Sequence, residues 1–133
     1  MLAVREHTQV ELRNKLKRAH EPAVIEHILK SLAEQGLQSD ERYTELYVEL
    51  RRSKGYGPLR IGTELQDKGV DEALIDSYMD QNDSNWQSLM RQVVAKKYGA
   101  QLPADQKEMA RRGRFLSYRG FPSHLISAYL FSE

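Results

Sequence analysis

Two clusters of basic side chains carry the most distinctive chemistry in this sequence. The first cluster is Arg51, Arg52, Lys54 and Arg60. The second cluster is Arg111, Arg112, Arg114 and Arg119, with Lys96 and Lys97 shortly before it. Arginine outnumbers lysine in these clusters, and its planar guanidinium makes paired hydrogen bonds with carboxylates and phosphates. The clusters therefore predict an anionic partner.

Tyrosines lie within or beside both clusters, at Tyr56, Tyr98 and Tyr118. Basic residues interleaved with exposed aromatic rings suit a groove for single-stranded nucleic acid. They suit an acidic protein surface equally well, because arginine and tyrosine are favoured at the centres of protein interfaces. A third interpretation is that the tyrosines pack on helix ends while the arginines are only solvated. The residues alone leave all three open.

The sequence lacks the residue patterns of an enzyme. The histidines His7, His20, His27 and His124 have no metal-ligand spacing, and there is no cysteine. Acidic pairs such as Asp40 and Glu41 stand where helices are expected to begin, which favours the helix dipole. The turn at residues 54–58 contains glycine but lacks the phosphate-loop pattern. We therefore predict no catalysis, no cofactor and no metal.

The clusters must be positioned by repeats, because the sequence recurs with a spacing of 51 residues. Arg60, Gly62 and Lys68-Gly69 recur as Arg111, Gly113 and Arg119-Gly120. Leu74, Ile75, Tyr78 and Met79 recur as Leu125, Ile126, Tyr129 and Leu130, with a fainter copy at Val24, Ile25, Ile28 and Leu29. A fixed period is the signature of stacked supersecondary units.

The apolar spacing within each repeat is helical, and strand signals are missing. We predict an all-α fold of tandem repeats with up to three helices each, stacked into an elongated, curved helical array. The repeats are predicted at residues 1–37, 38–83 and 84–133. The first is short at its N-terminus, so either it is naturally short or a helix precedes this sequence.

Particular residues are expected to begin helices and to face the core. Thr8 with Glu11 and Ser84 with Gln87 have the spacing of capping boxes. Pro58 suits the first position of a helix that runs to Gly69, and a later helix is predicted over residues 106–118. The side chains predicted to face the core are Tyr43, Leu46, Tyr47 and Leu50 in the second repeat and Trp86, Leu89, Val93 and Val94 in the third.

The net charge of +1 hides a strong asymmetry. Residues 37–83 carry −5 and residues 84–133 carry +5, while residues 1–36 carry +1. Such asymmetry favours a charged macromolecular partner, although solvated helix faces that simply differ in charge would look the same. No apolar run is long enough to span a bilayer, and the N-terminus does not read as a signal peptide. We expect a soluble cytoplasmic monomer.

The turn and its surroundings resemble a known family. Residues 54–58 (KGYGP), continued by Arg60-Ile61, Glu64-Leu65 and Lys68-Gly69, are similar to the central signature of the bacterial RecX family. Residues 2–8 (LAVREHT), with Glu11-Leu12 and Lys15-Leu16, resemble its first repeat. The third repeat of that family is similar to Trp86 and to residues 97–99 (KYG), 114–116 (RFL) and 118–121 (YRGF) of this chain.

The resemblance implies a regulator without catalysis of its own. RecX proteins bind RecA, the ATP-dependent recombinase that coats single-stranded DNA, and lodge in the helical groove of its filament. They limit filament extension and so restrain ATP hydrolysis, strand exchange and the co-protease activity that turns on the SOS response. The resemblance thus implies a role in DNA recombination and repair.

Two functional hypotheses follow. The first is a RecA-binding negative regulator, which could also contact single-stranded DNA inside the filament, and the second is a stand-alone helical module for single-stranded nucleic acid. Both place the partner on the same side chains: Arg51, Arg52, Lys54, Tyr56, Arg60, Lys96, Lys97, Arg111, Arg112, Arg114 and Arg119.

Overall fold

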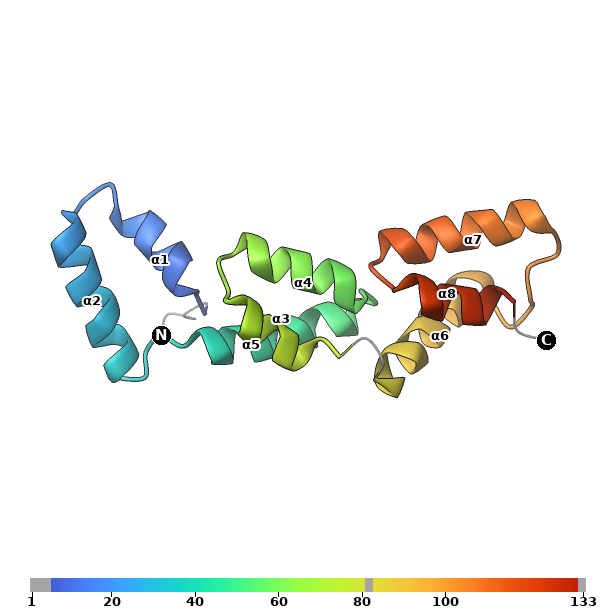
Figure 1. Cartoon of the computed structure of the whole chain (residues 1–133), viewed down its shortest axis with the longest axis horizontal. Coiled ribbons are helices and arrows are strands. Elements are labelled where there is room, and N and C mark those ends of the chain that lie inside the picture. Colours follow the sequence, from blue (N-terminus) through green and yellow to red (C-terminus); the bar gives the residue numbers. More distant parts are fainter. Residues whose placement is uncertain (1–5, 81–82, 132–133) are drawn as a thin grey trace. The chain divides into compact units, whose positions relative to one another are not determined.

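The computed structural model describes residues 6–80 and 83–131. Within those ranges every regular element is an α-helix and no strand occurs, which confirms the predicted all-α class (Figure 1). The helices are α1 (Gln9–Leu16), α2 (Pro22–Glu34), α3 (Asp40–Ser53), α4 (Pro58–Asp67), α5 (Glu72–Tyr78), α6 (Ser84–Tyr98), α7 (Gln106–Tyr118) and α8 (Ser123–Leu130). Residues 2–5, which contribute to the family resemblance, lie outside the described residues.

The chain forms two compact units whose boundary passes through α3 and α4. The first unit comprises Met1–Val48 and Glu64–Tyr78. The second comprises Glu49–Thr63 and Met79–Glu133. Each unit therefore combines two helices that pair closely, α1 with α2 or α7 with α8, with parts of α3 and α4. The three predicted repeat ranges stay a prediction.

The beginning of α1 confirms one predicted cap. The hydroxyl of Thr8 accepts a hydrogen bond from the Glu11 amide at 3.1 Å, and the Glu11 carboxylate accepts one from the Thr8 amide at 3.1 Å. The same hydroxyl donates to the carbonyl of Lys68 at 2.7 Å. Thr8 is completely buried. It therefore both caps α1 and ties that helix to the turn between α4 and α5.

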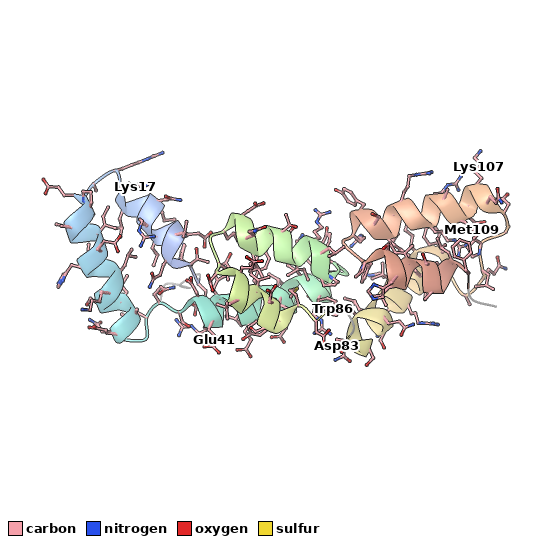
Figure 2. The ribbon with its side chains drawn as sticks, viewed as in Figure 1. Lys17, Glu41, Asp83, Trp86, Lys107 and Met109 are labelled. Atoms are coloured by element: carbon pink, nitrogen blue, oxygen red, sulfur yellow. The ribbon has the colours of Figure 1, made fainter. Side chains whose placement is uncertain are left out.

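The predicted cap of α6 is wrong by one residue. Asp83, not Ser84, is the N-cap, and its carboxylate accepts a hydrogen bond from the Asn85 amide at 2.9 Å. Asp83 and Trp86 stand together at the beginning of this helix in Figure 2. Aspartate and serine are both good N-caps. The sequence offered both residues side by side, and the helix begins after Asp83 rather than after Ser84.

The predicted core face of α3 is also partly wrong. Tyr43, Thr44 and Val48 are buried, while Leu46 and Leu50 are 49% and 52% exposed. The Tyr43 ring stacks on the Tyr47 ring at 5.8 Å between centroids. Together with the half-buried Tyr47, the buried residues have the i, i+1, i+4 and i+5 spacing that was predicted for the last helix of each repeat, rather than the expected i, i+3, i+4 and i+7 spacing.

The core of the first unit includes apolar residues that recur between the repeats. Its buried apolar side chains are Ile25, Leu29, Tyr43, Val48, Leu65, Val70 and Ile75. Val24, which was predicted to belong to the same stripe, is 45% exposed. The stripe on α2 is therefore narrower than the one on α8, where Leu125, Ile126 and Tyr129 are all buried.

The second unit has a larger core. Its buried apolar side chains are Ile61, Trp86, Met90, Val94, Leu116, Phe121, Leu125, Ile126 and Tyr129. On α6 the buried positions are Trp86, Met90 and Val94. Leu89 and Val93, expected in this core, are only half-buried. They face a cavity.

Candidate interaction surface

The turn between α3 and α4 is held against the turn between α7 and α8 by backbone contacts. The Gly57 amide donates to the Arg119 carbonyl at 2.8 Å, and the Leu59 amide donates to the Gly120 carbonyl at 2.9 Å. A Cβ atom on Gly57 would lie 2.6 Å from the Gly120 carbonyl oxygen. A Cβ atom on Gly120 would collide with the Arg60 backbone. Both glycines are therefore required by a close backbone approach.

The first unit contains an equivalent contact one repeat earlier. Thr8, at the start of α1, bonds the carbonyl of Lys68, and the Val10 side chain occupies the place that a Cβ atom on Gly69 would need. Lys68 and Gly69 are the residues that recur, 51 positions later, as Arg119 and Gly120. The recurring Gly thus marks the same kind of joint twice.

Around the joint of the second unit, arginines and tyrosines alternate. The Tyr56 ring lies under three guanidinium groups, at 3.9 Å from Arg51, 4.6 Å from Arg60 and 4.9 Å from Arg119. Arg60 also lies 4.7 Å from the ring of Tyr118, a residue that is 70% exposed. These cation–π contacts help to hold the guanidinium groups in place, and Nη1 of Arg60 also donates to the Tyr118 carbonyl at 3.1 Å while Nη1 of Arg119 donates to the Lys54 carbonyl at 2.9 Å. The result is an oriented arginine surface.

A second group of cations lies beside α6. The Arg52 guanidinium lies 4.6 Å from the Trp86 ring, and the Lys97 ammonium lies 4.3 Å from the Phe115 ring. The lysines beside them, Lys54 and Lys96, are exposed. The sequence indicated these cations but not the rings on which they rest. Trp86 and Phe115 could have been found only from their distance to the clusters in space.

Arg112 was predicted to contact a partner, but it is a structural residue. It is 3% exposed. Its Nη1 atom donates to the Tyr129 hydroxyl at 2.6 Å and to the Gln101 carbonyl at 2.8 Å, and its Nη2 atom donates to Glu108 at 2.6 Å. The Ala104 amide and the Arg112 guanidinium hold the pKa of Glu108 below its usual value. Arg112 therefore ties α7 to α8 and to the loop before α7.

The neighbours of Arg112 on α7 behave differently. Arg111 and Arg114 are both exposed, and no ion pair to either is found in the described part of the chain. Because residues three apart on a helix are neighbours on its surface, these two arginines form a small basic patch of their own. The structure thus brings the predicted residues together in three places: the tyrosine cluster, the group beside α6 and this patch.

Catalytic and metal-binding arrangements are not found among the described residues. No group of three histidine, cysteine or acidic side chains there is placed to hold a metal ion. No helix among residues 6–80 and 83–131 is long and apolar enough to cross a membrane. The main chemical feature of this surface is a set of arginine and lysine side chains that lie against aromatic rings.

Comparisons with known proteins identify the family. Residues 39–79 match the family model described as RecX, second three-helix domain, and residues 85–130 match RecX, third three-helix domain. The regulatory protein RecX of Pseudomonas syringae pv. tomato is 44% identical over 98% of this chain and 84% of its own length. RecX of Pseudomonas tolaasii is 46% identical over the same shares.

Solved structures have a similar fold. A crystal structure of RecX from Lactobacillus salivarius matches with a TM-score of 0.76 at 21% identity, covering 97% of this chain and 86% of that chain. A second crystal structure of the regulatory protein RecX matches with a TM-score of 0.78 at 26% identity, covering 98% and 66%. These likenesses confirm a tandem array of helical repeats. The chain belongs to the RecX family of regulatory proteins, and this membership confirms the prediction that it is not an enzyme.

Proposed function

We propose that this chain is a negative regulator of the RecA recombinase. It binds RecA and RecA filaments on single-stranded DNA, and it limits filament extension, ATP hydrolysis, strand exchange and the co-protease activity of the SOS response. The observation that carries the proposal is the family membership over 98% of the chain. The regulator acts as a cytoplasmic monomer in the helical groove of the filament.

The basic surface of the second unit supports the proposal. Arg51, Arg60 and Arg119 share one tyrosine ring, so their guanidinium groups are oriented before any partner arrives. Pre-orientation lowers the entropy that binding would otherwise cost. Guanidinium groups fixed in this way recognise carboxylates of a protein and phosphates of DNA with the same geometry. A filament of RecA on DNA presents both.

The test is the single-stranded-DNA-dependent ATPase of RecA, with this protein titrated in. Inhibition well below one copy per RecA would support capping of filament ends, and inhibition only near equimolar ratios would support occupancy along the groove. If the folded protein leaves the ATPase unchanged at every ratio, the proposal is wrong.

Charge reversal on α7 sharpens the test. The double variant Arg111→Glu with Arg114→Glu should weaken inhibition, because both side chains are exposed and neither belongs to an ion pair described within residues 6–80 and 83–131. Arg112 must stay, because it is buried. The matched control is Lys17→Glu with Arg18→Glu, two exposed residues of the first unit. Equal inhibition by both double variants would remove the α7 patch from the interface.

The second candidate function is a stand-alone module for single-stranded nucleic acid. The exposed Tyr118 ring beside Arg60 favours it, because a base could stack there. Phosphate-dominated binding to naked DNA would fall with salt by a log–log slope of about −0.7 per neutralised phosphate. Weak binding to naked DNA with tight binding to RecA-coated DNA would exclude this candidate.

A further inference from the structure

A cavity of 710 Å³ opens between the end of α3, the middle and end of α6 and the end of α7. All of its lining residues belong to the second compact unit. Its wall carries five cationic side chains: Arg52, Lys54, Lys96, Lys97 and Arg119. No aspartate or glutamate lines it.

These cations have no anionic partner among residues 6–80 and 83–131. The ion pairs described there involve Arg13, Arg42 and Arg112 instead. Three of the five are held in place: Arg52 rests on the Trp86 ring, Lys97 rests on the Phe115 ring, and Arg119 donates to the Lys54 carbonyl at 2.9 Å. Five like charges around one hollow repel each other, so an anion that enters it relieves the repulsion.

The floor of the cavity is apolar. We define the floor as the three apolar side chains of the lining, Leu89, Val93 and Phe115, which are half-buried, whereas Lys54, Lys96 and Lys97 of the wall are exposed. A bare phosphate or carboxylate group would gain nothing from such a floor, because burying an anion on apolar surface costs free energy. The lining therefore fits a ligand that carries negative charge at its edges and one apolar group at its centre.

The Phe115 ring is not available as a stacking platform for a nucleobase. Lys97 lies 4.3 Å and Arg119 lies 5.2 Å from its centre, and Tyr98 meets it at 86° with 5.8 Å between centroids. Leu89 and Val93 are aliphatic and offer no aromatic face. Single-stranded nucleic acid binds by stacking on free aromatic faces, so a polypeptide fits this cavity better than a nucleotide.

We propose that this cavity binds an acidic segment of a partner protein, with one apolar side chain of that segment on the floor and its carboxylates against the cationic wall. The identity of the partner rests on the proposed function, under which the segment belongs to RecA. The binding chemistry does not depend on that identity.

The first experiment measures fluorescence anisotropy of a labelled short peptide, one central leucine between two runs of aspartate, with the full chain titrated in. The comparison peptide has serine in place of leucine. The comparison nucleic acid is an oligothymidylate of the same net charge. We expect the leucine peptide to bind about tenfold more tightly than the serine peptide, the ratio that burial of one such side chain supplies.

Two sets of variants locate the binding. Lys54→Glu with Lys96→Glu reverses two exposed charges of the wall and should weaken binding of the leucine peptide by about tenfold or more. The control with equal net charge, Lys30→Glu with Lys107→Glu, changes exposed lysines outside the cavity. Lys107 lies at the start of α7 (Figure 2), whereas Phe115 lies in the last turn of that helix. It should leave binding unchanged. Leu89→Ser should abolish the preference for leucine over serine.

The outcomes separate the inference from the proposed function. Equal effects of the wall variant and its control, or tighter binding of the oligothymidylate through the same lysines, would overturn the inference. If the wild-type chain still inhibits the RecA ATPase in that case, the proposed function stands without this cavity. If it neither binds the peptide nor inhibits RecA, both fail.

Discussion

Gly57→Ala is the sharpest test of the joint between the two turns of the second unit. Gly57 is not one of the glycines with positive φ, so alanine brings no backbone strain of its own. The cost comes from one methyl group. That group would stand 2.6 Å from the Gly120 oxygen, 2.7 Å from the Gly120 carbonyl carbon and 2.8 Å from the Phe121 ring.

The magnitude follows from these distances. Carbon atoms in ordinary contact are about 3.5–4.0 Å apart, so the two turns must separate by about 1 Å. The Gly57 and Leu59 amides, now 2.8 Å and 2.9 Å from their acceptors, would then exceed the usual hydrogen-bond range. Two backbone hydrogen bonds, each worth about 1 kcal/mol, and the contact of Phe121 would be weakened. We expect a loss of about 2–4 kcal/mol.

The assay is urea-induced unfolding of the full chain, followed by circular dichroism, with amide hydrogen exchange at Gly57 and Leu59. The control is Gly113→Ala within α7, where the added methyl meets the side chains of Leu130 at 3.4 Å and Ile126 at 3.9 Å and no backbone atom. Alanine is a better helix former than glycine, so this variant should gain about 0.5–1 kcal/mol. If both variants shift the midpoint in the same direction, or if exchange at the two amides is unchanged in Gly57→Ala, the reasoning is refuted.

Three further predictions concern the capping and ion-pair residues. Thr8→Ala should lower the free energy of unfolding by about 1–3 kcal/mol, since it removes a cap and the hydrogen bond to the part-buried Lys68 carbonyl. Thr8→Ser, which keeps the hydroxyl, should recover most of this loss in urea unfolding. Arg112→Met should cost about 3 kcal/mol because it removes the hydrogen bonds to the Tyr129 hydroxyl and the Gln101 carbonyl and the ion pair with Glu108, whereas Arg111→Met, at an exposed position of the same helix, should cost almost nothing; similar midpoints would contradict the structural role. The lowered pKa of Glu108 contributes stability that is present above the usual carboxyl pKa and lost as the pH falls through the folded value. Glu108→Gln should therefore shrink the loss of stability between about pH 6 and about pH 3, and an unchanged loss would show that this carboxylate does not contribute.

The fold could be predicted from the sequence because its signals are local and repeated. Pro58 at a helix start, Thr8 with Glu11 at another and the recurring apolar quartet each specify a helix without reference to distant residues. The buried face of α3 could not be predicted, because Leu46 and Leu50 are as apolar as residues that are buried. Which stripe turns inward is decided by the neighbouring helices.

The candidate site was predicted less completely, for a physical reason. A run of arginines reads the same whether each one is solvated, resting on a ring or buried. Arg112 differs from Arg111 only because Tyr129 and the Gln101 carbonyl, both distant in sequence, converge on its guanidinium. The contacts of Arg52 with the Trp86 ring and of Lys97 with the Phe115 ring likewise join residues that are distant in sequence. Long-range contacts of this kind leave no periodic signal.

The sequence left open whether the turn at residues 54–58 serves folding or contact, and the structure lets it serve both. Its backbone is taken up by the joint, through the Gly57 and Leu59 amides. The side chains of Lys54 and Tyr56 therefore project from a backbone that the joint holds in place. Lys54 lines the cavity, and the Tyr56 ring lies beneath three guanidinium groups. A partner that binds either surface therefore contacts side chains whose positions depend on Gly57 and Gly120. Gly57→Ala should consequently weaken peptide binding to the cavity even in conditions where the chain remains folded, while Gly113→Ala should not.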